Sequence, residues 1–253
     1  MANAGREPIS RRERPAKRAL SRQAIVAAAL RLIRSPGNDG LTLRRLAAEL
    51  DTGAASLYVY FKDTDELYAA VLDELLGGLN FRRGRKPWRE RLISLLTSYS
   101  ELLTAYPALA KTALFTRPSA ANSVRLWEAL LGLLDEGDIG DQDAAWTVDL
   151  LLQRATATAA EQGVRLQDAN TAAADAQVAE VIDHLSPKDH PHLAGMAEEL
   201  FTGTPTTRLI WSFEVLLDGI AARRQAATRP HQTAKAGATR DKGAQTVSAR
   251  RRS

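Results

Sequence analysis

The chain has 253 residues, 45% of them hydrophobic, no cysteine and a formal net charge of +4. The lack of cysteine excludes disulfides, thiolate catalysis and cysteine-ligated metals, and no apolar run approaches the roughly 18–20 residues that span a bilayer. The basic N-terminus lacks the apolar segment of a secretory signal, so we expect a cytoplasmic protein without a membrane partner.

The charge is distributed unevenly along the chain. Residues 1–19 carry a net charge of +4 and residues 223–253 a net charge of +8, whereas residues 91–222 carry −10. We expect a disordered basic arm at 1–19 and a disordered basic tail at 226–253, because neither segment has apolar periodicity. Basic ends around an acidic body are typical of a protein that meets DNA with one face. Tails that are merely solvated are the alternative.

Helical periodicity begins at Ser21, which can cap a helix running to about residue 35. A cluster of turn residues at 36–40 ends that helix. The stretch 42–61 then reads as two short helices across a turn that contains Gly53, with Leu57 and Phe61 as apolar positions of the second helix. This pattern predicts a helix-turn-helix, whose second helix can enter the DNA major groove.

Further helices follow through most of the remaining chain. A fourth helix is expected from Asp63, which has capping-box spacing to Glu66. The others are predicted at about 88–105, 107–115, 119–136, 142–163, 171–185, 192–201 and 205–225. The fold class is therefore all-α, with a three-helix helix-turn-helix domain at 20–80 and a helical domain at 81–225.

Two of these segments, 144–160 and 208–222, are apolar over more than one face, which exceeds what a surface helix needs. Burial on two sides, inside the domain and against a second subunit, would explain this pattern. A wholly intramolecular core is the alternative.

Residues 20–80 resemble the N-terminal domain of TetR/AcrR-type bacterial transcriptional regulators. The resemblance rests on the Leu41-Thr42 start, the Leu46-Ala47 and Leu50 spacing, the run SLYVYFK at 56–62 and the following Asp65-Glu66-Leu67. It implies that residues 81–225 form an effector-binding and dimerisation domain. It also implies a homodimer on a palindromic operator in double-stranded DNA, from which a small-molecule effector releases it. We expect repression, and activation is the alternative.

The same resemblance implies a set of DNA contacts. Residues at the start of the first motif helix hold phosphates or reach a base, three small residues face base edges, and three others clamp the phosphate backbone. In that order they are Thr42 and Arg44; Ala54, Ala55 and Ser56; and Tyr58, Tyr60 and Lys62. Small side chains cannot read a base in bidentate fashion, so direct sequence reading should be modest. Asp51 stands where similar proteins often have the glycine of the turn.

Aromatic side chains beside polar groups in the C-terminal region make an apolar effector pocket plausible. The candidate lining residues are Tyr99, Tyr106, Phe115, Trp127, Trp146, Gln153 and Trp211. Plain core packing is the alternative for each of them.

The sequence predicts no cofactor and no metal site. His184, His190 and His192 lie within nine residues, but the segment between them reads as a loop without fixed ligand spacing. No nucleophile motif or phosphate loop appears, so we do not expect an enzyme. A non-specific nucleoid or architectural DNA-binding protein and, more remotely, a small helical enzyme are the rival functions.

Overall fold

The computed structural model describes residues 20–34, 41–81, 84–115 and 120–228. Within these ranges the chain forms twelve α-helices and no strand, which confirms the predicted all-α class. The predicted basic arm lies outside the described residues. So does the predicted tail from residue 229 onward, while residues 226–228 belong to the last helix.

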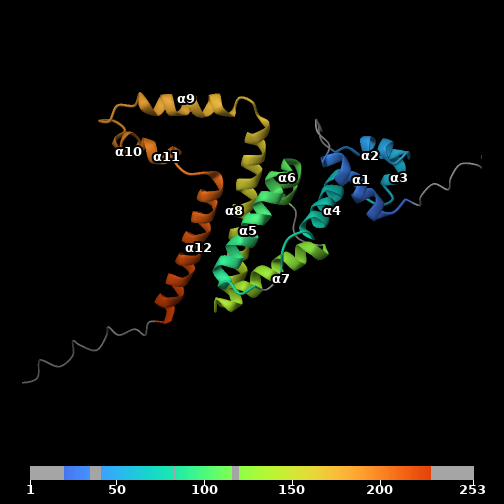
Figure 1. Cartoon of the computed structure of the whole chain (residues 1–253), viewed down its shortest axis with the longest axis horizontal. Coiled ribbons are helices and arrows are strands. Elements are labelled where there is room, and N and C mark those ends of the chain that lie inside the picture. Colours follow the sequence, from blue (N-terminus) through green and yellow to red (C-terminus); the bar gives the residue numbers. More distant parts are fainter. Residues whose placement is uncertain (1–19, 35–40, 82–83, 116–119, 229–253) are drawn as a thin grey trace, which may run out of the picture.

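The N-terminal domain consists of α1 (Arg22–Arg34), α2 (Leu43–Glu49), α3 (Ala54–Leu57) and α4 (Thr64–Leu76), which lie together at one end of the molecule (Figure 1). Its core contains Ile25, Leu46, Leu57 and Phe61, which are fully buried. This small core fixes α3 against α1 and α2.

Three predicted caps begin these helices. The Ala24 amide donates to the Ser21 hydroxyl at 3.1 Å, and the Arg45 amide donates to the Thr42 hydroxyl at 3.2 Å. The Glu66 amide donates to the Asp63 carboxylate at 2.8 Å. Each cap satisfies an N–H that has no partner within its own helix.

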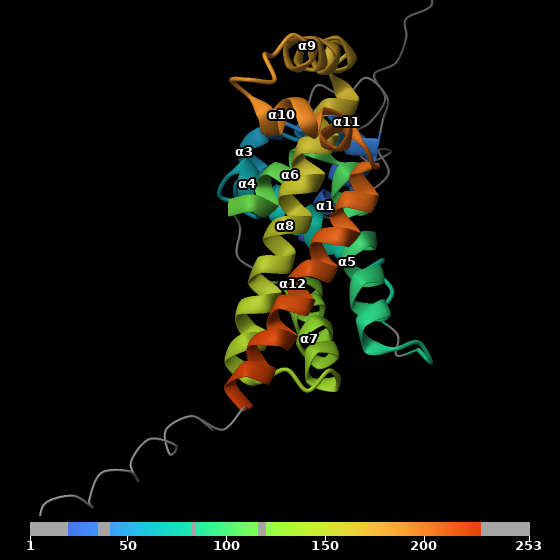
Figure 2. The same ribbon diagram turned by 90° about the vertical axis from the view of Figure 1, so that its left-hand side faces the viewer.

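The C-terminal body consists of α5 (Trp88–Thr104), α6 (Pro107–Phe115), α7 (Ala121–Glu136), α8 (Asp141–Gln167) and α12 (Pro205–Thr228). The 27-residue α8 is its central element and packs against all four of the other helices. Figure 2 shows α8 and α12 running beside each other along the length of the body. Helix α4 packs on α6 and α7 and so joins the N-terminal domain to the body.

Two glycines behave differently from each other. Gly137 ends α7 as predicted, and the adjacent Asp138 takes the left-handed conformation with φ 59°. Gly163 was predicted to end a helix, which is wrong, because α8 continues to Gln167. A Cβ at residue 163 would lie 2.7 Å from the Cγ of Pro107, so this glycine permits the close crossing of α6 and α8.

Helices α9 (Thr171–Asp183), α10 (Pro191–Gly195) and α11 (Ala197–Phe201) form an excursion between α8 and α12 that stands out from the body (Figure 1). None of the three helices has a buried residue. The single helix predicted at 192–201 is wrong. The helix is interrupted at Met196, directly after Gly195, and glycine weakens helix interiors. None of the helices described is long and apolar enough to cross a membrane.

Candidate DNA-binding surface and effector cavity

The turn between α2 and α3 sets the direction of the second motif helix. Asp51 adopts φ 48°, the left-handed conformation that glycine often supplies at this point. Asp pays a modest steric cost there that its short polar side chain tolerates. Helix α3 spans only Ala54–Leu57, and turns continue the coil to Tyr60, where the Tyr60 amide donates to the Leu57 carbonyl at 2.9 Å.

Most of the predicted DNA contacts are exposed residues of the motif. Exposed members come from the start of α2, from α3 and from the turns after it, and two small residues are half-buried. The exposed ones are Thr42, Arg44, Ala55, Tyr58 and Lys62, and the half-buried ones are Ala54 and Ser56. A hydroxyl, a guanidinium and an ammonium beside a helix start are groups that bind phosphate, whereas the small side chains let the backbone come close to base edges.

Tyr60 does not fit its predicted role as a phosphate contact. It is half-buried, and its hydroxyl donates to the Leu20 carbonyl at 2.6 Å. That bond uses the donor proton which a phosphate contact would need, so Tyr60 fastens the segment before α1 to the motif. The nearby Tyr58 is 57% exposed, so it is open to the solvent.

Sequence reasoning missed Val59, which is 81% exposed directly beside Tyr58. A large apolar side chain so open at the end of this motif is available for contact with a thymine methyl group or a deoxyribose. The position of Val59 between two tyrosines was the signal in the sequence that could have indicated its exposure. That signal was ambiguous because Leu57 and Phe61 on either side are core residues.

Sequence reasoning also missed Arg22, which holds the end of the helix-turn-helix motif in place. Its Nη1 donates to the Tyr60 carbonyl at 2.7 Å and to the Glu66 carboxylate at 3.0 Å, and its guanidinium lies 4.2 Å from the Phe61 ring centroid. The Lys62 amide donates to the second Glu66 oxygen at 2.9 Å. The hydrogen bond from the Lys62 backbone amide, and next the hydrogen bond from the Arg22 side chain, hold the pKa of Glu66 below its ordinary value.

A cavity of about 980 Å³ lies where the N-terminal domain meets the body. Its walls come from α1 and α4 on one side and from α5, α6, α7 and α8 on the other. That volume is at the upper end of what small-molecule sites offer. The cavity therefore touches both the N-terminal domain and the body.

Four of the seven candidate pocket residues line this cavity: Tyr99, Phe115, Trp127 and Gln153. Phe115 is 89% exposed at its edge, and Trp127 is half-buried. The other three do not line it and need correction. Tyr106 instead accepts a hydrogen bond from Arg34 Nε at 3.3 Å.

The remaining two are surface residues. Trp146 on α8 and Trp211 on α12 are 60% and 64% exposed, and neither lines the cavity. Both were predicted as pocket residues because they are aromatic side chains in a region that also has polar groups. Aromatic character does not tell which face of a helix points inward, and here it marks an outer surface.

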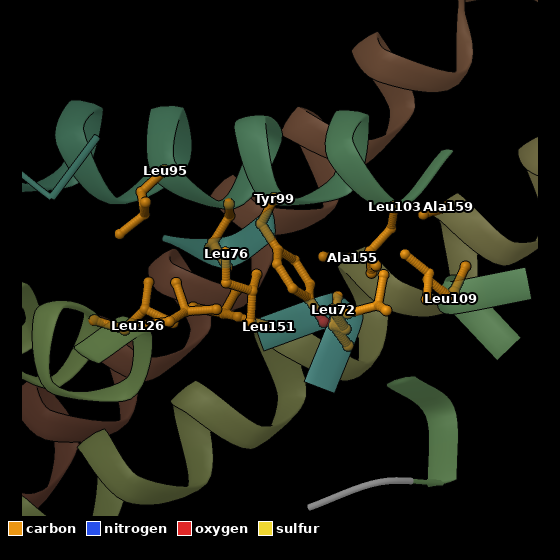
Figure 3. Packing of buried hydrophobic residues seen from close by; sticks show 14 of the residues in the cluster. Leu72, Leu76, Leu95, Tyr99, Leu103, Leu109, Leu126, Leu151, Ala155 and Ala159 are labelled. Atoms are coloured by element: carbon orange, nitrogen blue, oxygen red, sulfur yellow. The ribbon is translucent and has the colours of Figure 1, made fainter. Parts of the chain in front are cut away.

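The deep wall of the cavity carries one polar pair. The Tyr99 hydroxyl lies 2.9 Å from the Thr156 hydroxyl, and both residues are buried. Figure 3 shows the Tyr99 ring pointing from α5 towards Leu72 and Leu76 of α4. Burial raises the pKa of Tyr99, so the phenol stays protonated near neutral pH and one hydroxyl proton of the pair is available to a ligand oxygen.

The lining also has a charge pattern. Among the described lining residues, four carboxylates (Glu66, Asp73, Glu74 and Asp149) accompany one guanidinium, that of Arg22. Such a wall disfavours an anionic ligand by simple repulsion. It suits a neutral or cationic amphipathic molecule, which the aromatic rings of Trp127 and Phe115 can also contact.

The histidine segment shows no assembled metal site. His184 follows α9 and its Nδ1 lies 2.8 Å from the Glu180 carbonyl oxygen. No group of three or more His, Cys, Asp or Glu side chains in the described part of the chain is placed to hold a metal ion.

Comparison with known proteins gives two family matches that together cover most of the chain. Residues 25–71 match the model "Bacterial regulatory proteins, tetR family", and residues 82–224 match "Tetracyclin repressor-like, C-terminal domain". A solved Streptomyces chain, SCO7704, described as a candidate transcription regulator, is 46% identical. The match covers 80% of this chain and 94% of that one, with a TM-score of 0.67.

A second solved relative carries a ligand. The TetR family protein ActR of Streptomyces coelicolor, in complex with actinorhodin, is 29% identical over 81% of this chain and 96% of its own, with a TM-score of 0.73. The tetracycline repressor of class C from Escherichia coli is 33% identical over 122 residues, which is 47% of this chain. This chain spans about half the length of the curated relatives it matches. The helix-turn-helix, the helical body and both family matches lead to one conclusion: the chain belongs to the TetR family of transcriptional regulators.

Proposed function

We propose that this protein is a cytoplasmic repressor that binds a palindromic operator as a homodimer and leaves it when a small-molecule effector binds. The observation that carries the proposal is the cavity, because α1 and α4 of the DNA-binding domain form part of its wall. A molecule that enters it contacts the DNA-binding domain and the body at once. The relative ActR is described in complex with actinorhodin, which supports an effector role for the cavity.

The exposed motif surface supports sequence-specific DNA binding. Tyr58 and Lys62 would hold phosphates, while Ala54, Ala55 and Ser56 approach base edges. Because these small groups discriminate weakly between bases, Arg44 and the shape of the DNA would supply much of the specificity.

Dimerisation would use the outer faces of α8 and α12. These helices bury Val148 and Leu217 inside the body yet expose Trp146 and Trp211 on their other sides. Two-sided apolar character of this kind is what a second subunit would cover. In such a dimer the two motifs would occupy successive major grooves, about 34–36 Å apart.

The effector would act by favouring a dimer conformation whose motifs no longer match that spacing. A coupling free energy of roughly 1–3 kcal/mol between cavity and operator is enough to change occupancy by about 5- to 150-fold. Helix α4 is the natural connection because it belongs to the DNA-binding domain and lines the cavity.

The test is footprinting on the DNA upstream of the protein's own gene, and on operators selected from a random pool, at two salt concentrations. A protected palindrome that survives excess random DNA supports the proposal. Protection that disappears with random competitor favours a non-specific architectural protein, which would bind through phosphates alone.

A further inference from the structure

Helix α7 begins without a cap of its own. Its N-cap residue is Ala120, which has no side chain able to accept a hydrogen bond, so the first amides of the helix need a partner from elsewhere. The partner is Asp73 of α4, about fifty residues earlier in the chain. The Ser123 amide donates to Asp73 Oδ1 at 2.7 Å, and the Asn122 amide donates to Asp73 Oδ2 at 3.3 Å.

These contacts reproduce the geometry of an N-cap across two helices. A capping side chain normally accepts from the second or third helical residue, which in α7 are Asn122 and Ser123. The Ser123 hydroxyl adds a bond to Asp73 Oδ1 at 2.8 Å. The negative charge of Asp73 also lies at the positive end of the α7 dipole.

The exchange is reciprocal, because α7 in turn serves the end of α4. Asn122 Nδ2 donates to the Asp73 backbone carbonyl at 3.0 Å, within the last turn of α4. Arg125 Nη1 donates to Asn122 Oδ1 at 3.3 Å and so holds that amide with its nitrogen towards α4. The start of α7 is therefore capped by a side chain of α4, and Asn122 adds a second hydrogen bond to a carbonyl that already accepts from the Gly77 amide at 3.2 Å.

This joint lies at the cavity. Asp73 and Ser123 both line it, as do Leu72 and Leu126 beside them. We propose that the cap exchanged between Asp73 and the start of α7 transmits cavity occupancy to the DNA-binding domain. A ligand that separates α4 from α7 removes the cap of α7. In the reverse direction, a shift of α4 that accompanies DNA binding changes the same cap and so changes the affinity of the cavity for its ligand. The inference rests on the proposed repressor function and names the residues that couple the cavity to operator binding.

The cap itself is tested without DNA or ligand, by residue-resolved hydrogen exchange on the full-length protein. Asp73→Ala should speed exchange of the Asn122 and Ser123 amides by roughly 3- to 30-fold, the range for loss of an N-cap. Asp73→Asn should stay near wild-type rates, because asparagine caps as well as aspartate does. Glu74→Ala is the matched control, since it removes one carboxylate from the next, exposed position of α4. Unchanged exchange in Asp73→Ala would overturn the cap.

The transmission is tested by operator affinity, with random duplex of the same length measured in parallel. Asp73→Ala on α4 and the Asn122→Ala/Ser123→Ala pair on α7 should each weaken operator binding by roughly 3- to 30-fold. Because they break one joint, the combined variant should be no weaker than either. Binding to random duplex should not change, since the joint contacts no phosphate.

Three results separate the possible failures. Faster exchange with unaltered operator affinity would overturn the transmission and leave the cap standing. Additive losses from the two helices would also overturn it, because independent sites add. A wild-type protein that does not prefer operator over random duplex would refute the proposed function, and the exchange data would still decide the cap.

Discussion

Substituting Trp146 and Trp211 with alanine tests the outer faces of α8 and α12 as a dimer interface. Both side chains are more than half exposed in the single chain, yet they lie on helices whose opposite faces are fully buried. Exposed tryptophan on two neighbouring helices is costly unless a partner covers it. We therefore expect each Trp→Ala change to weaken self-association strongly.

The magnitude follows from the exposed area. A tryptophan presents up to about 250 Å², so exposures of 60% and 64% leave roughly 150 Å² open on each. At about 25 cal/mol per Å², full coverage contributes about 3–4 kcal/mol per side chain as an upper limit. Ordering of side chains and loss of overall freedom reduce that figure, so about 2 kcal/mol per tryptophan is a fair expectation. Each residue occurs twice in a symmetric dimer, which makes the total about 4 kcal/mol, or close to a 1,000-fold rise in dimer Kd.

Sedimentation velocity over a dilution series measures that constant directly. Phe115→Ala is the matched control, because it removes an aromatic ring that is even more exposed, from the edge of the cavity rather than from α8 or α12. It should leave the dimer constant within about threefold. Wild-type protein that stays monomeric at high concentration, or tryptophan variants that dimerise like wild type, would refute the reasoning.

Three further predictions concern single interactions. Tyr60→Phe should lower the free energy of unfolding by about 1 kcal/mol in urea titration and leave DNA affinity nearly unchanged, whereas Tyr58→Phe should do the reverse in filter-binding assays. The pKa of Glu66 is lowered in the folded state, so its stabilisation is present above its ordinary pKa of 4.5 and is lost as pH falls through the lower folded value. Glu66→Gln should therefore remove part of the acid sensitivity seen in melts taken below about pH 5, by at most about 1 kcal/mol for so exposed a pair. Gly163→Ala should destabilise the body by about 1–3 kcal/mol in thermal melts because its methyl group meets Pro107, while Gly132→Ala, on an open surface, should not destabilise it.

Local rules were sufficient for most of the fold. The caps at Ser21, Thr42 and Asp63 and the apolar core of the motif depend on spacings of three or four residues, and the structure has them all. Asp51, which departs from the glycine that similar proteins often have in the turn, adopts the left-handed conformation there. Errors arose where one residue has two possible uses. A glycine can end a helix or admit a close neighbour, and the sequence around Gly163 does not contain Pro107.

The site was less accessible to sequence for the same reason. The resemblance predicts which residues of the motif contact DNA. It does not predict the hydrogen bond of the Tyr60 hydroxyl, whose partner Leu20 is forty residues away. Aromatic residue type selected Tyr99 and Trp127 correctly for the cavity wall. It could not separate them from Trp146 and Trp211, because that distinction depends on which helices pack together.

The polar contacts between the two parts of the molecule support our proposal that a cavity at this position controls DNA binding. Arg34 of α1 meets Tyr106, which lies between α5 and α6, and Asp73 of α4 meets the start of α7. Apolar packing between helices tolerates small sliding, since its energy depends mainly on buried area, whereas a hydrogen bond weakens steeply with distance and angle. These contacts therefore set the positions of α1 and α4 more sharply than the surrounding leucines can. Asp73 lies in the cavity wall, so a ligand reaches one of the sharpest constraints on the DNA-binding domain without having to disturb its core.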